Sequence, residues 1–161
     1  MGHAEDELAL RNLAYAYSDA CGRKDPVAMA AVYAPDGELQ VASTGVSVKG
    51  VAKLERAFRR LVEVDRAFLV QMTTGGVVEI KGDEANCRWW FTEIKQHTNE
   101  TFYRYLVGVY EDVAVRLHDG WRFSQRRATA MFEWHLPQGG QTHTPMHEFL
   151  PIAPPIGLRP A

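Results

Sequence analysis

A tight turn between two long segments of β-strand character is the feature that most constrains the fold. The turn covers residues 118–120, and Asp119-Gly120 is its central pair. The segments beside it, about 101–117 and 121–134, both carry charged residues. This arrangement predicts a β-hairpin. Strands are usually about 5–6 residues long, so longer ones are expected where a sheet bends strongly. The charges predict a polar site on that sheet.

The apolar residues change their spacing along the chain. Up to about Val64 they recur with a helical period, and after Phe68 they alternate as they do in strands. The first helix carries one apolar stripe, made of Leu10, Leu13, Ala14, Tyr17 and Cys21. Tyr17 is therefore expected to point inward. We expect a left-handed cap at Gly22, because glycine adopts that conformation without steric strain.

A second helix is predicted to begin at Asp25, whose side chain caps it, with Pro26 at its first position. It is expected to end in a turn at 34–37. Short strands follow at 38–41 and 45–48, and a third helix starts near Gly50. The arginines of that helix, Arg56, Arg59 and Arg60, are interpreted as its solvated face.

The rest of the chain predicts a meander of antiparallel strands at 69–80, 85–96, 101–117 and 121–134, with turns at 81–83, 97–99 and 118–120. Helices that come first and strands that follow predict an α+β domain over residues 1–134. Residues 135–161 contain many prolines and glycines and are expected to form an extended arm, not a separate domain. Because the arm also contains apolar residues, we expect it to cover a cavity of the domain or to cross onto a neighbouring subunit.

Composition and charge limit the possible partners. The 161 residues include 18 Lys plus Arg and 20 Asp plus Glu, and no basic run interleaves with aromatic residues, so nucleic acid is not an expected partner. No membrane span or secretory signal is recognised. The two cysteines, Cys21 and Cys87, are expected to be reduced, which predicts a cytoplasmic protein.

The sequence gives little support for a metal site. His143, His147 and Glu148 lie close together, but they belong to the arm rich in proline and glycine, where helical facing is not expected. Neither a metal nor a cofactor is therefore predicted.

Two motifs in the predicted meander carry a resemblance. They are Gly-x-Tyr-x-Asp-x-x-x-Arg at 108–116 and Asp-Gly-Trp-Arg-Phe-x-x-Arg at 119–126. With the order of the elements, they make the chain similar to the ketosteroid-isomerase-like proteins of the nuclear-transport-factor-2-like fold, and more narrowly to the SnoaL-like group. That group includes scytalone dehydratase, bile-acid 7α-dehydratase and hexachlorocyclohexane dehydrochlorinase. The resemblance implies a cone-shaped, curved antiparallel or mixed sheet, with three N-terminal helices that enclose a cavity.

The resemblance also implies that this chain lacks the group's usual catalytic dyad. In the dehydratase and dehydrochlorinase members, an aspartate near the end of the first helix orients a histidine on the first long strand, and the histidine abstracts a proton. These positions correspond to Gly22 and Gln71 here. Neither residue can perform that chemistry.

The resemblance also assigns other functional positions of these proteins to residues of this chain. Tyr17 corresponds to a catalytic tyrosine, and Asp112 to an acid that donates to an oxyanion. Arg126 corresponds to a cavity arginine, and Gln71 would orient polar substituents with it. Trp89 and Phe102 are candidate cavity walls. As alternatives, Tyr17, Trp89 and Phe102 could be core residues, and Asp112 could pair with Arg116, Arg126 or Arg127.

We therefore expect an enzyme without a cofactor, of the lyase, isomerase or cyclase type, that acts on a hydrophobic, cyclic, oxygenated small molecule. Its base would be Asp19, Glu93 or a displaced histidine such as His97, unless the substrate assists. The alternatives are a protein of the same fold that only binds a small molecule, and a protein with an assembly role. The expected partners are that small molecule and further copies of the chain in a homodimer or homotrimer.

Overall fold

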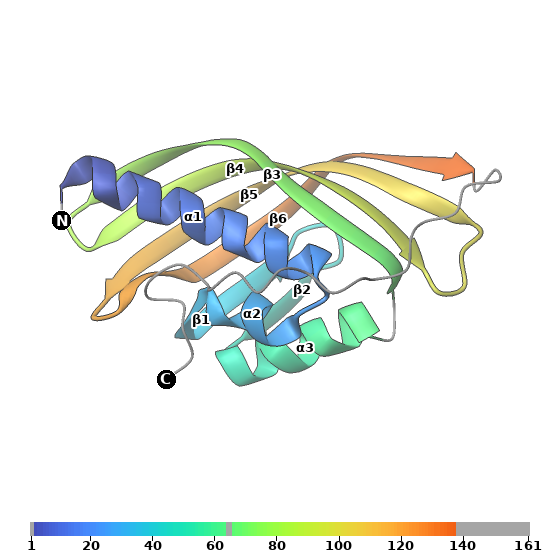
Figure 1. Ribbon diagram of the computed structural model, residues 1–161, viewed down its shortest axis with the longest axis horizontal. Coiled ribbons are helices and arrows are strands. Elements are labelled where there is room, and N and C mark those ends of the chain that lie inside the picture. The colour runs from blue at the N-terminus through green and yellow to red at the C-terminus, as the bar shows by residue number, and fades with distance from the viewer. Residues whose placement is uncertain (1, 64–65, 138–161) are drawn as a thin grey trace.

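The computed structural model describes residues 2–63 and 66–137 (Figure 1). Three helices, α1 (His3–Gly22), α2 (Pro26–Ala31) and α3 (Val51–Glu63), lie with one six-stranded sheet. The strands are β1 (Tyr33–Val41), β2 (Val46–Lys49), β3 (Arg66–Lys81), β4 (Glu84–His97), β5 (Phe102–Leu117) and β6 (Gly120–Pro137). The predicted α+β class is confirmed.

The sheet is mixed and open. Its strand order is β2-β1-β6-β5-β4-β3, so β2 and β3 are its edges. Strands β3 to β6 form the predicted antiparallel meander, and β1 joins β6 in parallel, with Leu39 opposite Arg126. The only parallel pairing among the described residues thus connects the N-terminal half of the domain to its last strand.

Both ends of α1 are held by polar contacts. Arg116 of β5 donates two hydrogen bonds of 2.6 Å to the Asp6 carboxylate, and Trp121 Nε1 donates one of 3.1 Å. Farther along α1, the hydroxyls of Ser18 and Thr73 lie 2.7 Å apart and link the helix to β3. The helix is therefore fixed across the sheet, with its apolar stripe facing the strands (Figure 1).

The predicted left-handed cap at Gly22 is wrong. Gly22 is the last residue of α1, and Lys24 adopts the positive φ, at 54°. The amide of Asp25 donates to Ala20 O at 2.9 Å, so the reversal of the chain falls two residues later than predicted. As predicted, Pro26 begins α2, and the Asp25 side chain accepts from the Ala28 amide at 2.9 Å.

The turn expected at 34–37 is instead part of β1. The amide of Phe123 donates to Val32 O at 2.9 Å, which draws this segment into the sheet, and the register with β6 shifts between Tyr33 and Glu38. Gly37 lies so close to β6 that a Cβ atom there would be 2.7 Å from Phe123 O. Glycine permits this close approach of the two backbones.

The hairpin at Asp119-Gly120 is confirmed. Gly120 has a φ of 121° and Gly82, in the β3–β4 turn, a φ of 64°, values that favour glycine. Strand β6 continues past Trp134 to Pro137. The rest of the predicted arm, 138–161, lies outside the described residues, as do His143, His147 and Glu148.

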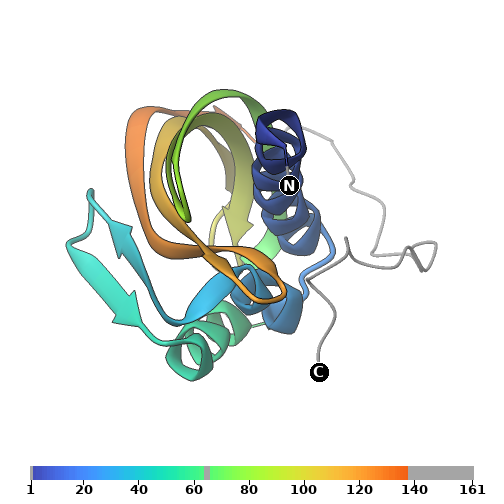
Figure 2. The same cartoon turned by 90° about the vertical axis from the view of Figure 1, so that its left-hand side faces the viewer.

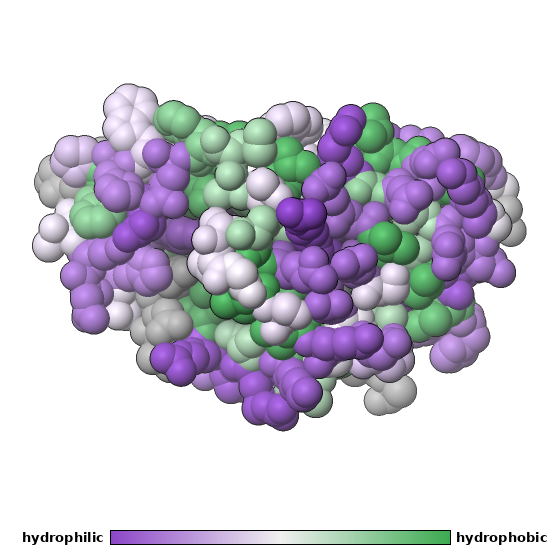
Figure 3. Space-filling view, turned by 180° about the vertical axis from the view of Figure 1, so that it is seen from behind, coloured by the Kyte–Doolittle hydropathy of each residue, from purple (hydrophilic) through white to green (hydrophobic). Residues whose placement is uncertain are grey.

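The core lies between the curled sheet and the helices. Seen from its end, the sheet curls around the molecule while α1 lies along one side, and α2 and α3 lie beside β1 (Figure 2). The most buried large side chains come from both layers and include Leu10, Met29, Leu54, Trp89 and Phe123. Viewed from behind, hydrophobic and hydrophilic residues are interspersed over the surface, and hydrophilic residues also lie across its middle and along its lower edge (Figure 3). No helix in the described ranges is long and apolar enough to cross a membrane.

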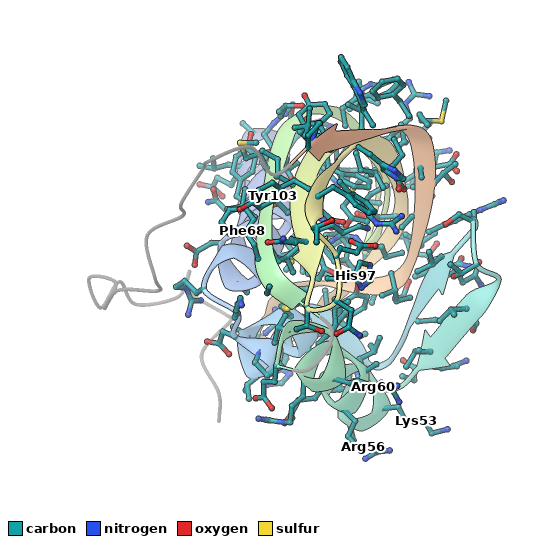
Figure 4. The ribbon with its side chains drawn as sticks, turned by 90° about the vertical axis from the view of Figure 1, so that its right-hand side faces the viewer. Lys53, Arg56, Arg60, Phe68, His97 and Tyr103 are labelled. Carbon is teal, nitrogen blue, oxygen red and sulfur yellow. The ribbon has the colours of Figure 1, made fainter. Side chains whose placement is uncertain are left out.

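The cationic residues of α3 lie on its outer face, as predicted. Lys53, Arg56 and Arg60 are exposed and project from the helix away from the sheet (Figure 4). Arg59 pairs with Glu55 and Glu63 of the same helix, at 2.9 Å in each case. These charges belong to a solvated helix surface.

Candidate active site

A partly open cavity of about 240 Å³ lies between the helices and the inner face of the sheet. Its walls are mostly apolar, and they include Met29, Leu39, Val41, Phe58, Leu61, Leu69, Phe91 and Leu106. The polar side chains that line it are fewer, and they are Tyr17, Ser43, Thr44, Gln71, Glu93, Lys95 and Tyr110. An apolar chamber with a few convergent polar groups is typical of a small-molecule site.

Three polar side chains meet on the strand side of this cavity. Gln71 Nε2 donates to Tyr110 Oη at 2.7 Å and to Glu93 Oε2 at 3.1 Å. The other oxygen of Glu93 lies 2.8 Å from Lys95 Nζ, and the side chains of Lys95 and Glu93 are only 17% and 16% exposed. The cavity therefore contains a carboxylate that is held in position by an amide and an ammonium group.

The two cavity tyrosines are suited to donate hydrogen bonds. Burial raises the pKa of Tyr17 and of Tyr110 well above the ordinary value, so both hydroxyls stay protonated. The Tyr110 ring stacks on Phe91, with centroids 4.2 Å apart, and meets the edge of Tyr17 at 6.0 Å. Gly108 permits the stack, because a Cβ atom there would lie 2.5 Å from Phe91 Cζ.

A buried ion pair lies behind the tyrosines. Arg126 donates to both oxygens of Asp112, at 2.9 and 2.7 Å, and the two side chains are 1% and 0% exposed. The guanidinium carbon lies 4.6 Å from the Tyr17 ring centroid, 4.2 Å from that of Tyr110 and 4.1 Å from that of Phe123. The pair thus supports both tyrosines from behind.

The geometry of this pair is that of two ions. Burial by itself lowers the pKa of Arg126, but Asp112 more than offsets that effect and the net pKa is raised. Burial raises the pKa of Asp112, and Arg126 opposes this shift. Two parallel charge-assisted hydrogen bonds of normal length are the geometry of a guanidinium with a carboxylate.

The residues predicted for the site fall into three groups. Tyr17 and Gln71 line the cavity. Asp112 and Arg126 do not line it, and both Asp112 oxygens accept from Arg126, so Asp112 is not positioned as an oxyanion donor. Of the pairings left open for Asp112, the structure contains the one with Arg126.

The two predicted wall residues lie elsewhere. Trp89 is buried beneath Arg11, whose guanidinium carbon is 5.9 Å from its ring, and it does not line the cavity. Phe102, at the start of β5, stacks on His135 with centroids 4.5 Å apart, also outside the cavity.

The three candidate bases differ in whether they line the cavity. Asp19 is 65% exposed on α1 and pairs with Arg23 at 2.8 Å. His97 lies at the end of β4, on the side of the molecule that Figure 4 shows, and does not line the cavity. Glu93 alone of the three is a cavity residue. Gly22 ends α1, and a Cβ atom there would contact only Val70, at 3.8 Å.

A larger but open groove, of about 550 Å³, lies on the opposite face of the sheet. Most of the side chains that line it, such as Arg88 and Arg127, alternate along the strands with buried residues such as Trp89 and Arg126. Arg88, Glu111 and Arg127 form a row of cross-strand neighbours there, and all three are exposed. Exposed paired charges are typical of a solvated sheet surface, so the smaller cavity is the candidate site.

The family model of the SnoaL-like domain matches residues 2–127. The chain belongs to the SnoaL-like family. No curated protein matches its sequence.

Solved structures share this fold. One is named a putative scytalone dehydratase from Novosphingobium aromaticivorans, with a TM-score of 0.74 and 18% identity, covering 87% of this chain and 97% of that one. Another is named hexachlorocyclohexane dehydrochlorinase LinA-type3 from Novosphingobium barchaimii, with a TM-score of 0.76 and 16% identity, covering 89% of this chain and 97% of that one. At these identities the likeness establishes the fold alone, which is the cone-shaped fold that the sequence predicted.

Proposed function

We propose that this SnoaL-like cavity performs acid–base chemistry, of the lyase, isomerase or cyclase type, on a small, hydrophobic, cyclic, oxygenated molecule. The names of the neighbouring structures suggest a fold that processes small molecules. One observation carries the proposal, namely that Glu93 presents a carboxylate to a mostly apolar cavity. In this chain, which has glycine and glutamine at the dyad positions, Glu93 takes the role of the missing base.

The proposed reaction starts on a carbon next to a carbonyl group. Glu93 takes the proton, the electron pair of the C–H bond forms the new C=C bond, and the carbonyl π electrons move onto its oxygen. The protonated hydroxyl of Tyr17 or Tyr110 donates a hydrogen bond to that oxyanion. If the substrate has a further C=C bond conjugated with the new one, return of the proton at the far carbon of that bond completes an isomerisation. Departure of a leaving group, with its electron pair, from the carbon next to the deprotonated one completes an elimination. Arg126 acts as a positioning residue, because it contacts both tyrosine rings and does not line the cavity. Asp112 acts through its ion pair with Arg126.

Proton abstraction can be measured without knowledge of the natural substrate. Tetralone, a bicyclic ketone, is incubated with the protein in D₂O, and NMR follows the loss of its α-proton signal. We expect the wild type to accelerate the exchange, and Glu93→Gln to reduce that acceleration about 100-fold or more, the usual contribution of a general base. Glu111→Gln is the matched control, because Glu111 is exposed on the opposite face of the sheet. Equal exchange rates in the wild type and Glu93→Gln contradict the proposal.

A protein that only binds its ligand is the second candidate. It is favoured by the contacts of Glu93, because Lys95 and Gln71 already occupy its two oxygens. Tetralone that binds the wild type, as measured by calorimetry, and exchanges no faster than in buffer supports this candidate.

A further inference from the structure

A buried acceptor atom of a residue that lines the cavity has no hydrogen-bond partner. Among the described residues, four buried side-chain atoms lack a hydrogen-bond partner, and they belong to Tyr33, Gln71, Trp89 and Arg126. Of these residues only Gln71 lines the cavity, and its relative exposure is 6%. An unpaired buried carbonyl is costly, so Gln71 Oε1 is an atom that a ligand can satisfy.

The orientation of the Gln71 amide follows from its neighbours. A carboxylate can only accept hydrogen bonds, so the amide nitrogen, and not its oxygen, must face Glu93 Oε2 at 3.1 Å. The same nitrogen donates to Tyr110 Oη at 2.7 Å. Its two N–H groups are therefore used within the protein, and the carbonyl oxygen is the part of the amide left for a ligand.

The contact with Gln71 also determines what Tyr110 offers. Because Tyr110 Oη accepts from Gln71 Nε2, its own proton remains available for another acceptor. Burial raises the pKa of Tyr110, so this proton is retained. The cavity thus presents an acceptor, Gln71 Oε1, and a donor, the Tyr110 hydroxyl, on neighbouring side chains. A single hydroxyl group on a ligand satisfies both, whereas an ether or carbonyl oxygen satisfies only the donor.

We propose that Gln71 is a specificity-determining residue that selects ligands with a free hydroxyl group, an alcohol, phenol or enol on an apolar ring system. The inference rests on the proposed small-molecule function of the cavity and adds the polar group that its ligand carries. Gln71 occupies the position where the family's dyad has histidine. In this chain the residue at that position recognises the hydroxyl group of the ligand and does not abstract a proton.

The test compares three probes of one ring system, which are naphthol, methoxynaphthalene and naphthalene. Their affinities are measured by calorimetry for the wild type and for Gln71→Met, which has a similar length and no acceptor oxygen. We expect the wild type to prefer naphthol over methoxynaphthalene about five- to tenfold, the worth of one hydrogen bond. Gln71→Met should lower this preference to about twofold or less and leave the naphthalene affinity within about twofold.

Two further variants serve as controls for the effect of Gln71→Met. Tyr110→Phe retains the ring on Phe91 and removes the hydroxyl, which is the donor to the ligand and the acceptor of the Gln71 Nε2 bond. Because Gln71 Oε1 stays in place, the variant should weaken naphthol and methoxynaphthalene alike and keep the ratio between them. Gln125→Met, in the groove on the opposite face, should change neither affinity. Naphthol that does not bind the wild type, or a preference that survives Gln71→Met, overturns the inference. Failure of the proposed function is distinguishable, because Glu93→Gln then leaves proton exchange unchanged while Gln71→Met still removes the hydroxyl preference.

Discussion

Replacement of Arg126 by methionine should make the stability of the domain strongly dependent on pH. The substitution keeps most of the side-chain volume and leaves the Asp112 carboxylate, which is 0% exposed, without its one ion-pair partner among the described residues. An uncompensated buried carboxylate is costly, so Asp112 should take up a proton in the folded state.

The size of the stability loss follows from the free energy needed to protonate Asp112 in the folded state. An aspartate in the unfolded chain has a pKa of about 3.9. If the carboxyl must stay protonated in the folded state, each pH unit above that value lowers the free energy of unfolding by about 1.4 kcal/mol. At pH 7 the loss therefore approaches about 4 kcal/mol, within the range of about 3–5 kcal/mol for broken buried ion pairs. The folded state binds more protons than the unfolded state, so the free energy of unfolding of the variant should rise as the pH falls, by about 1.4 kcal/mol per unit between pH 7 and pH 4.

Urea unfolding followed by tryptophan fluorescence at pH 7, 6 and 5 measures this dependence. Arg127→Met is the matched control, because Arg127 is the next residue of β6 and is exposed on the opposite face, so it should change stability by less than about 0.5 kcal/mol. The double variant Arg126→Met with Asp112→Leu should recover most of the lost stability at pH 7. A loss below about 1 kcal/mol that does not vary with pH would refute the reasoning, since Asp112 would then remain charged at little cost.

Two further predictions concern α1 and the stacked rings. The Arg116 hydrogen bonds to Asp6 outweigh desolvation and lower the Asp6 pKa from 3.8 to about 2, so Asp6→Asn should cost about 2 kcal/mol at pH 7. Because the Asp6 pKa is lowered by folding, this contribution is present above about pH 4 and disappears as the pH falls towards 2, which acid titration of both proteins by circular dichroism measures. Gly108→Ala introduces a methyl group 2.5 Å from Phe91 Cζ and should cost about 1–3 kcal/mol in thermal or urea unfolding.

Each of these has a matched control. Asp83 also pairs with Arg116 but is 81% exposed, so Asp83→Asn should change stability little. Gly75 has no atom within 4 Å of its would-be Cβ position, so Gly75→Ala should not introduce a clash. An Asp6→Asn protein whose deficit persists unchanged at pH 2, or equal effects of the two alanine substitutions, would contradict the corresponding prediction.

The elements with strong local signals were predictable. Asp25 and Pro26 mark the start of α2 because a cap and a preset φ act within one turn. The Asp119-Gly120 hairpin follows from turn chemistry that is equally local. The cap of α1 was misassigned because Lys24 takes a positive φ in spite of its side chain, and its Nζ donates to Ala67 O on β3 at 3.1 Å, a contact between segments far apart in the sequence.

The composition of the site was harder to predict. Glu93 was one of three candidate bases, and Lys95 was not expected in the site at all. The signal was present, since Trp89, Phe91, Glu93 and Lys95 are two residues apart and share one face of β4. However, Trp90 and Ile94 place apolar residues on the other face as well, so the alternation that is clear at 84–89 becomes ambiguous at the site itself. Only the pairing of β4 with β3 and β5 decides which face is inside.

The parallel pairing of β1 with β6 has a consequence for the order of folding. Leu39 and Val41, two walls of the cavity, are held in the sheet by Arg126 and Ala128, which follow them by most of the length of the domain. Contacts between such distant segments form late, because the intervening chain must first lose conformational freedom. On a ribosome, the helical half and the hairpins from β3 to β5 are synthesised before β6 exists. The cavity is therefore completed only when the last strand is in place, and a nascent chain arrested before β6 should lack the part of the wall that Leu39 and Val41 form.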